Sequence, residues 1–142
     1  MDFAYTTGQG IAWRVMIKEK IEGLGEFEFY RDYFIGRIYE GVNAGPDFSD
    51  LLSELIQKHF SGRPVIYISD RVNSYSVDPM ATKDLIVRNN IQFTAAVVYT
   101  RRQKRISSFE DKIIEETKRC SFDSIAAAVS WAELKAQELN PE

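Results

Sequence analysis

Hydrophobic and polar positions alternate in the first third of the chain, and this alternation predicts strands. Residues 13–22 place apolar side chains mainly on one face and charged ones on the other, as a half-buried strand does. After a glycine-containing turn, residues 26–29 alternate glutamate with phenylalanine, and residues 33–42 are rich in β-branched and aromatic side chains. We expect an antiparallel meander in which Gly36 marks a bulge or a close approach of the backbone. Residues 1–12 show no sustained period and are expected to form a tail or arm.

The hydrophobic period becomes helical in the middle of the chain. Apolar residues from Phe48 to Phe60 recur at helical spacing and Gly62 follows them, so we expect a helix that ends just before this glycine. Asp78 followed by Pro79 predicts a second helix, because Asp caps an N-terminus and Pro fits the first helical position. The other expected elements are strands at 64–68 and 93–99, an edge strand or loop at 119–122, and helices with apolar stripes through 106–114 and 125–137.

These elements predict one α/β domain. A meander followed by helix, strand, helix, strand and two helices gives a mixed sheet of about five strands with about four helices, whose later part consists of right-handed βαβ crossovers. The length of 142 residues is typical of one domain, and no repeat or linker interrupts it. We therefore expect the domain to span residues 13–138, with residues 139–142 as a C-terminal tail.

Composition and charge exclude several classes of protein. Hydrophobic residues make up 44% and charged residues 27% of the chain, as in globular proteins, and the net charge of -3 disfavours general nucleic-acid binding. No apolar run approaches the roughly 20 residues of a membrane span. The single Cys120 cannot form an internal disulfide and the N-terminus lacks the pattern of a signal peptide, so the cytoplasm is the expected location.

Candidate residues for catalysis or metal binding are scarce. The only histidine, His59, ends the first predicted helix, and neither Ser74 nor Ser76 lies in a Gly-x-Ser-x-Gly turn. An enzyme would need His59 to face one of these serines, so we expect no catalytic residues. Cys120 lacks a second thiol and a histidine nearby in the sequence, so we expect no metal or cofactor and predict a small, buried, apolar side chain.

Two segments of the chain resemble a known family. Residues 65–79 read Val-Ile-Tyr-Ile-Ser-Asp-Arg-Val-Asn-Ser-Tyr-Ser-Val-Asp-Pro, and residues 121–131 read Ser-Phe-Asp-Ser-Ile-Ala-Ala-Ala-Val-Ser-Trp. With the order of elements over about residues 17–134, they resemble small bacterial STAS-like proteins. These are relatives of the SpoIIAA-like anti-sigma factor antagonists and, more loosely, of CRAL-TRIO lipid-binding domains. The resemblance implies a four-helix, mixed-sheet domain that binds a partner and catalyses no reaction.

The chain departs from the antagonist pattern at the start of the second predicted helix. The antagonists place a phosphorylatable serine there, usually within Asp-Ser-x-Gly, whereas this helix opens with Asp78 and Pro79 and no glycine follows. Ser74 and Ser76 lie near the corresponding position. The resemblance therefore makes these two serines candidate phosphorylation sites.

The loop from residue 70 to residue 78 is the candidate partner-binding site. It follows the carboxyl end of a predicted parallel strand, where ligands of open α/β sheets gather, and leads into a helix N-terminus, which favours anions. A purely local role competes with this interpretation, because Asp78 caps the helix and the other polar side chains satisfy the turn. The candidate residues are Asp70, Arg71, Asn73, Ser74, Tyr75, Ser76 and Asp78.

A basic segment near the start of the third predicted helix is the second candidate. Positive charge opposes the helix dipole there, so an acidic partner, or a phosphate on Ser107, would compensate it. The alternative is a solvated helix face that Glu110, Asp111 or the acidic N-terminal strands neutralise. The basic residues are Arg101, Arg102, Lys104 and Arg105.

Two functions remain after these observations. The first is a non-enzymatic, cytoplasmic regulatory or protein-interaction module that binds an unidentified protein partner, with a homodimer as one option. The second, which the CRAL-TRIO likeness suggests, is a carrier or sensor of a lipid or another apolar small molecule. An apolar cavity between sheet and helices would favour the carrier, and a closed core with an exposed polar loop would favour the interaction module.

Overall fold

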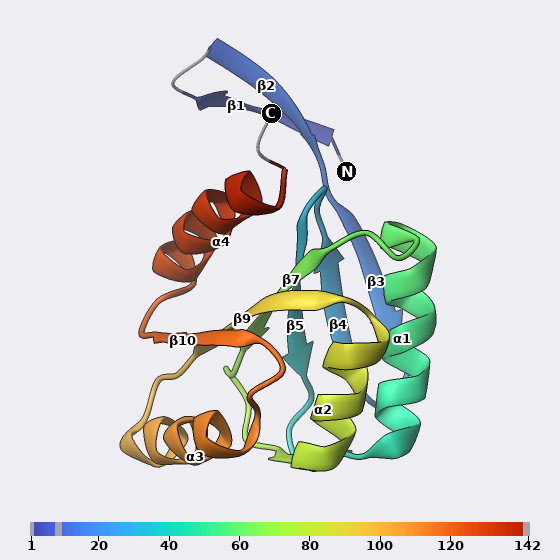
Figure 1. Cartoon of the computed structure of the whole chain (residues 1–142), viewed down its shortest axis with the longest axis vertical. Helices are drawn as coiled ribbons and strands as arrows, with labels where there is room; N and C mark the ends of the chain where they lie inside the picture. The colour runs from blue at the N-terminus through green and yellow to red at the C-terminus, as the bar shows by residue number, and fades with distance from the viewer. Residues whose placement is uncertain (1, 8–9, 141–142) are drawn as a thin grey trace.

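A six-stranded mixed sheet forms the centre of the protein (Figure 1). In spatial order its strands are β10 (Lys118–Phe122), β9 (Ile91–Val97), β7 (Val65–Asp70), β5 (Tyr33–Ile38), β4 (Gly25–Phe29) and β3 (Ile17–Ile21). The computed structural model describes residues 2–7 and 10–140, with side chains from Met16 to Asn140. β3, β4 and β5 pair antiparallel, whereas β5, β7, β9 and β10 pair parallel. The predicted α/β class, a meander followed by crossovers, is confirmed.

The N-terminal part of the chain differs from the prediction. Residues 13–22 are two strands, because β2 (Gly10–Val15) pairs with β1 (Asp2–Thr7) in a separate antiparallel sheet and β3 begins after the buried Met16. Alternation continues across Met16, so the hydrophobic pattern does not reveal this break. The sheet gains its sixth strand at the other end, where the segment predicted as an edge strand or loop is the edge strand β10.

The predicted tails lie only partly within the described residues. The described residues of the expected N-terminal tail or arm belong to β1 and β2. At the other end, α4 (Ile125–Leu139) continues two residues beyond the expected helix end at Gln137, and Asn140 caps it. Residues 1, 8, 9, 141 and 142 lie outside the described residues.

Helices cover both faces of the sheet (Figure 1). The helices α1 (Pro46–Phe60) and α2 (Pro79–Arg88) cover one face, α4 covers the other, and α3 (Arg101–Ile113) packs beside β10. Alternation along β7 supplies both cores: Tyr67 packs in the core beneath α1 and α2, whereas Ile66 and Ile68 pack against α4. The end of β7 therefore sends neighbouring side chains to opposite faces.

Two local predictions are confirmed by close contacts. The Met80 N–H donates to Asp78 Oδ1 over 2.9 Å, so Asp78 caps α2 as expected. A Cβ atom on Gly36 would lie 2.9 Å from Phe27 Cε1 and 3.1 Å from Tyr67 Cε1. The glycine is therefore required by a close approach of two aromatic rings.

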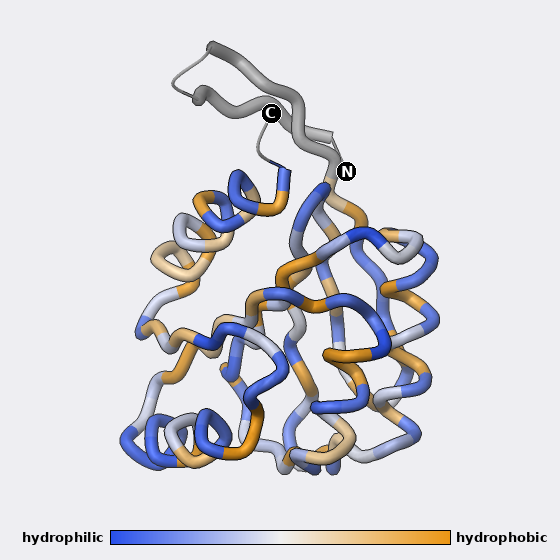
Figure 2. The backbone as a smooth tube through the Cα atoms, in the orientation of Figure 1, coloured by the Kyte–Doolittle hydropathy of each residue, from blue (hydrophilic) through white to orange (hydrophobic). Residues whose placement is uncertain are grey.

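The apolar stripe predicted for α3 is buried only at its C-terminal end, at the partly buried Ile113 and the buried Ile114. Ile106 is 42% exposed and Phe109 is 62% exposed, whereas Ser107 and Glu110 face inward and are buried. The tube of α3 is mostly hydrophilic in colour (Figure 2). Up to Glu110 this helix packs through a hydrogen bond of Ser107 and ion pairs of Glu110, so the apolar stripe does not mark the buried face there.

Candidate functional site

The 70–78 loop is tied to the neighbouring segment 41–44 by main-chain hydrogen bonds. β8 (Ser76–Val77) pairs in parallel with β6 (Asn43–Ala44), so the second half of the loop belongs to a small sheet. The shape of the loop is therefore set by the fold itself. The other main-chain bonds run from Gly41 N to Ser74 O (2.7 Å), from Ser76 N to Val42 O (3.0 Å) and from Asp78 N to Ala44 O (3.0 Å).

Polar side chains on the outer side of the loop also bond locally. Asn73 Nδ2 donates to the Ile38 carbonyl over 2.9 Å, and Ser76 Oγ donates to Asn43 Oδ1 over 3.0 Å. Ser74 donates its main-chain N–H to Glu40. Ser74 and Ser76 remain exposed to solvent, so the local bonds do not remove these two candidates from the surface.

Asp70 is not on the loop surface. It is 3% exposed and its side chain accepts from Arg37 Nε over 2.8 Å and from the Tyr99 hydroxyl over 2.6 Å. Arg37 also pairs with Glu28 on the neighbouring strand. Burial, with the hydrogen bond to Asp70, raises the pKa of Tyr99 to about 12. The prediction that Asp70 contacts a partner is wrong for this reason: the carboxylate is already paired inside the fold.

Arg71 also points inward, but to the other face of the sheet. Its Nη2 donates to Glu110 Oε1 over 2.6 Å, and the residue is 9% exposed. Arg119 Nη2 donates to the same Glu110 oxygen over 3.2 Å, while Arg119 Nε donates to Asp111 over 2.8 Å. Burial opposes the charge of Arg71, but the neighbouring Tyr75 and Glu110 outweigh it and raise the pKa of the guanidinium. Arg71 therefore joins β7 to α3 and β10, and is not a surface contact as predicted.

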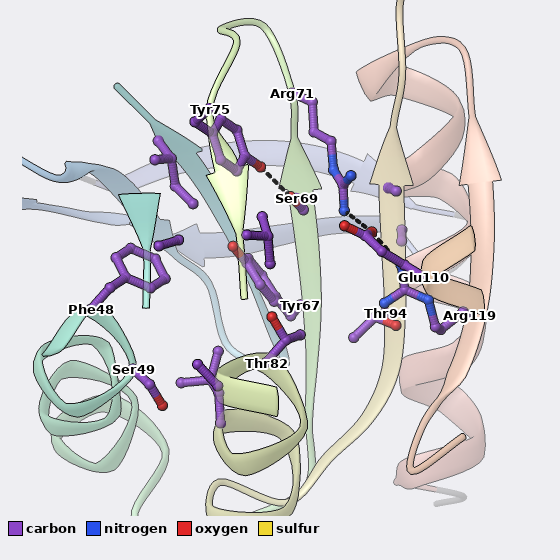
Figure 3. Close-up of a pocket in the computed structure, with 17 residues that line it drawn as sticks. Phe48, Ser49, Tyr67, Ser69, Arg71, Tyr75, Thr82, Thr94, Glu110 and Arg119 are labelled. Carbon is purple, nitrogen blue, oxygen red and sulfur yellow. Dashed lines mark hydrogen bonds and ion pairs between the residues drawn. The ribbon is translucent and has the colours of Figure 1, made fainter. Parts of the chain in front are cut away.

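Tyr75 is the third loop residue that faces the interior. Its hydroxyl and Ser69 Oγ share a hydrogen bond of 3.1 Å, and burial raises the pKa of Tyr75. Burial likewise raises the pKa of Tyr67, which lies beneath it on β7 (Figure 3). Both phenols therefore stay protonated at neutral pH and present neutral hydroxyl groups to the space below the loop.

That space is a cavity of about 50 Å³. Figure 3 shows Arg71, Glu110 and Arg119 at one end and Phe48 and Ser49 at the other. Its walls come from the sheet and from α1 and α2, and are mostly apolar. They include Ile38, Ala44, Val77, Ala81, Leu85 and Ala95.

Comparison with known proteins supports the fold. No family model matches the sequence, and no curated protein matches it. A solved structure is similar over 84% of this chain and 93% of its own, with a TM-score of 0.53 and 11% identity. It is an uncharacterised protein of the DUF3478 family with a SpoIIAA-like fold from Shewanella loihica PV-4. The present chain has a SpoIIAA-like fold. At this identity the likeness concerns the fold alone.

Within the SpoIIAA-like fold, the basic segment lies on the exposed side of α3. Thr100 accepts from the Gln103 N–H over 3.1 Å and the Gln103 side chain accepts from Thr100 N–H in return, so a capping box satisfies this N-terminus. Glu110 and Asp111 pair with Arg119, and the expectation that they neutralise the basic segment is wrong. The exposed residues are Arg101, Arg102, Lys104 and Arg105.

Ser107 does not fit the prediction of a modification site. Its side chain is 1% exposed and shares a hydrogen bond of 2.9 Å with Ser121 Oγ. A kinase would have to displace α3 from β10 to reach this hydroxyl. Ser74 and Ser76 are thus the predicted phosphorylation sites that remain exposed.

The histidine is remote from the loop. His59 Nε2 lies 2.7 Å from Glu19 Oε2, and its ring stacks on Phe29 with centroids 4.1 Å apart. α1 runs back along the sheet before β7 begins, so its C-terminal end and the 70–78 loop lie at opposite ends of the strands (Figure 1). The geometry does not bring His59 to Ser74 or Ser76, which the enzyme alternative needs.

Cys120 and the acidic residues form no evident metal site. Cys120 is exposed on the edge strand β10, so the prediction of a buried apolar side chain is wrong. Within residues 2–7 and 10–140, no group of three or more His, Cys, Asp or Glu side chains is placed to hold a metal ion. None of the helices described in these ranges is long and apolar enough to cross a membrane.

The ion-paired group Arg71–Glu110–Arg119 is the feature that sequence reasoning missed. Arg71 and Glu110 are 39 positions apart, so no local pattern relates them. One signal was present: Arg71 is in phase with Tyr67 and Ser69 along β7, which places it on the face of α1 and α2. Continuing the strand alternation by one residue would have predicted an inward arginine.

Proposed function

We propose that this chain is a non-enzymatic regulatory module that binds a protein partner in the cytoplasm through the outer side of the 70–78 loop and the first turn of α2. The observation that carries the proposal is that the loop is fixed by hydrogen bonds and yet exposes apolar side chains. Val72 is 52% exposed and Met80 is 66% exposed. We define the loop surface as Val72, Asn73, Ser74, Ser76 and Met80.

A fixed loop suits recognition for an energetic reason. Binding costs free energy when it orders mobile loops and side chains, and the main-chain bonds to segment 41–44 remove part of this cost beforehand. Exposed apolar side chains beside polar ones match the usual anatomy of an interface, with an apolar centre and a polar rim. The partner proposed is therefore a protein patch with an apolar centre that covers Val72 and Met80 and a rim of groups that hydrogen-bond to Ser74 and Ser76.

The carrier alternative has less support. Pockets for drug-sized ligands occupy about 300–1,000 Å³, whereas the cavity below the loop has about 50 Å³. A lipid chain would need the helices to separate from the sheet. A ligand of a few atoms needs no such change.

The decisive experiment is pairwise binding with a purified partner. The full chain is used to capture candidates, and each candidate is then measured by calorimetry against the parent, Val72→Asp and Ser74→Glu/Ser76→Glu. We expect both variants to bind at least about tenfold more weakly, because they bury charge at the interface. Thermal melting should change little, since these side chains are exposed.

The matched control changes an exposed serine elsewhere. Ser108 lies on the outer side of α3, next to the basic segment, and Ser108→Glu should leave binding unchanged. If Ser108→Glu and Arg101→Glu abolish binding while both loop variants bind as the parent does, the interface belongs to the basic segment and the loop assignment is wrong.

A further inference from the structure

Arg71 holds a spare hydrogen-bond donor inside the protein. Its Nη2 donates to Glu110, but its Nε–H has no acceptor among the residues whose side chains are described. The side chain is 9% exposed and lines the cavity. A buried N–H without an acceptor is costly, and it indicates a group that the protein itself does not supply.

A second buried polar group lines the same cavity. Thr94 is 6% exposed, and its Oγ1 has no hydrogen-bond partner within the described side chains. Thr94 is the register neighbour of Tyr67 on the adjacent strand, so it lies on the same face of the sheet as the cavity. Two unpartnered groups that come from different strands and border one cavity point to one small polar ligand.

The size of the cavity limits the ligand to a few atoms. A water molecule needs about 10–15 Å³ by this measure, so the space corresponds to about four waters within the 50 Å³ of the cavity. The charged groups lie at one end of this space, and the remaining walls combine apolar side chains such as Phe48, Ala81 and Leu85 with a few neutral hydroxyl groups. The ligand that matches has one polar end and a short alkyl part.

The charges that border the cavity favour an anion. Arg71 and Arg119 flank the single carboxylate of Glu110. Asp111 pairs with Arg119 from the half-exposed side, and Asp70 lies on the opposite face of the sheet with Arg37. The cavity lining thus carries two guanidinium groups and one carboxylate, and guanidinium is well suited to carboxylate ligands.

We infer that this cavity binds a short-chain monocarboxylate of about propionate size, through the Nε–H of Arg71. The carboxylate accepts from Arg71 and from the Thr94 hydroxyl, and the alkyl part lies against the apolar wall beneath α1 and α2. A free phosphate would leave that wall uncovered, and a long fatty acid exceeds the space. The inference concerns the interior below the loop and holds whether or not a protein docks on the loop surface.

The test follows the side-chain resonance of Arg71 in the full-length protein. Propionate is titrated into ¹⁵N-labelled protein at neutral pH, and the Arg71 Nε–H signal is recorded. We expect a saturable shift that is specific to this resonance, with the Nε–H of Arg37 unmoved because that group already donates to Asp70. Propionamide, which has the same shape without the charge, should bind at least about tenfold more weakly.

Variants separate the cavity from the surface. Ala81→Leu fills the space from the first turn of α2 and should abolish the shift while Arg71 stays in place. Arg71→Lys keeps a positive charge near Glu110 but lacks the Nε–H, and should weaken binding at least about tenfold. Arg37→Lys is the matched control on the other face and should bind as the parent does. Val72→Asp should also bind as the parent does, which separates this inference from the docking proposal.

Several results would overturn the inference. These are the absence of a saturable shift with propionate, an equal shift in Ala81→Leu, equal affinity for propionamide, or tighter binding of octanoate than of propionate. The last result would favour a carrier of longer apolar chains. If Arg71→Lys fails to fold, the comparison of Ala81→Leu with the parent, both checked by thermal melting, still decides the question.

Discussion

Asp70 and Arg71 are neighbours in the sequence but belong to two contrasting charged clusters. On the α4 side, the Asp70 carboxylate accepts from both Arg37 and Tyr99. On the side of α1 and α2, the Arg71 side chain donates to Glu110, and its Nε–H, beside a cavity, has no acceptor among the described side chains. We call the cluster around Asp70 closed, because its buried carboxylate is paired within the protein, and the cluster around Arg71 open, because one donor lacks a described acceptor. The contrast is between a buried cluster whose charged groups are matched within the protein and one whose remaining donor is the basis for the ligand inferred above.

The largest expected effect comes from removing Glu110. In Glu110→Ala, Arg71 and Arg119 lose their shared buried carboxylate, and breaking a buried pair in this way costs about 3–5 kcal/mol. The measurement is the free energy of unfolding in urea. Glu115→Ala, an exposed acid just beyond α3, is the control and should change this free energy by less than about 0.5 kcal/mol. Equal changes in the free energy of unfolding for the two variants would show that the ion pairs of Glu110 do not stabilise the fold.

A smaller loss is expected in the closed cluster. Arg37→Ala leaves the buried Asp70 with Tyr99 as a remaining donor, and Glu28 is partly solvated. Loss of a hydrogen bond to a charged group costs about 1.5–3 kcal/mol. Urea unfolding should therefore rank Arg37→Ala between Glu110→Ala and the exposed control. If Arg37→Ala lowered the free energy of unfolding more than Glu110→Ala does, the closed cluster would be the more stabilising of the two.

Tyr99 gives the closed cluster a dependence on alkaline pH. The folded pKa of about 12 lies above the ordinary value of 10.0, so the folded state holds its proton more tightly than the unfolded state. This contribution to stability is complete below about pH 10 and is lost as the pH rises toward 12. In Tyr99→Phe, the part of the stability loss at alkaline pH that is caused by ionisation of Tyr99 should disappear. Ultraviolet titration of tyrosinate should also lose one group that ionises near pH 12, and an unchanged titration curve would contradict the assignment.

The smallest effect is expected at Thr94. Its hydroxyl has no protein partner in the described part of the chain, so Thr94→Val removes an unmatched polar group and keeps the shape of the side chain. The free energy of unfolding should stay within about 0.5 kcal/mol of the parent or rise slightly. Propionate binding, in contrast, should weaken. A stability loss above about 1 kcal/mol would mean that Thr94 belongs to a closed network like that of Asp70.

The sequence predicts helices and strands well where a single hydrophobic periodicity gives both the type of secondary structure and its buried face. The spacing of Phe48, Leu52 and Ile56 predicted α1, and these residues are buried. Asp78 and Pro79 predicted the start of α2, since capping is a local interaction. Together with the meander, these signals were sufficient to predict the α/β fold class.

The orientation of α3 could not be predicted in the same way. Its inward side carries Glu110, which pairs with Arg71 and Arg119 from outside the helix, whereas Ile106 and Phe109 are exposed and the apolar stripe reaches the core only at its end. The cavity depends on the same long-range pairing. Of the predicted loop residues, Ser74 and Ser76 are at the surface, but Asp70, Arg71 and Tyr75 are not, because strand alternation and aromatic burial turn them inward.

The division of the sheet into a meander and a parallel part also bears on the order of folding. β3, β4 and β5 are joined by short turns, and hairpins of this kind form in about 1–10 μs. β5 and β7 are separated by the whole of α1, so their pairing must close a much longer loop and is intrinsically slower. We therefore expect the meander to form early and to serve as a template, with β9 exposing one edge until β10, the last strand in the sequence, pairs with it.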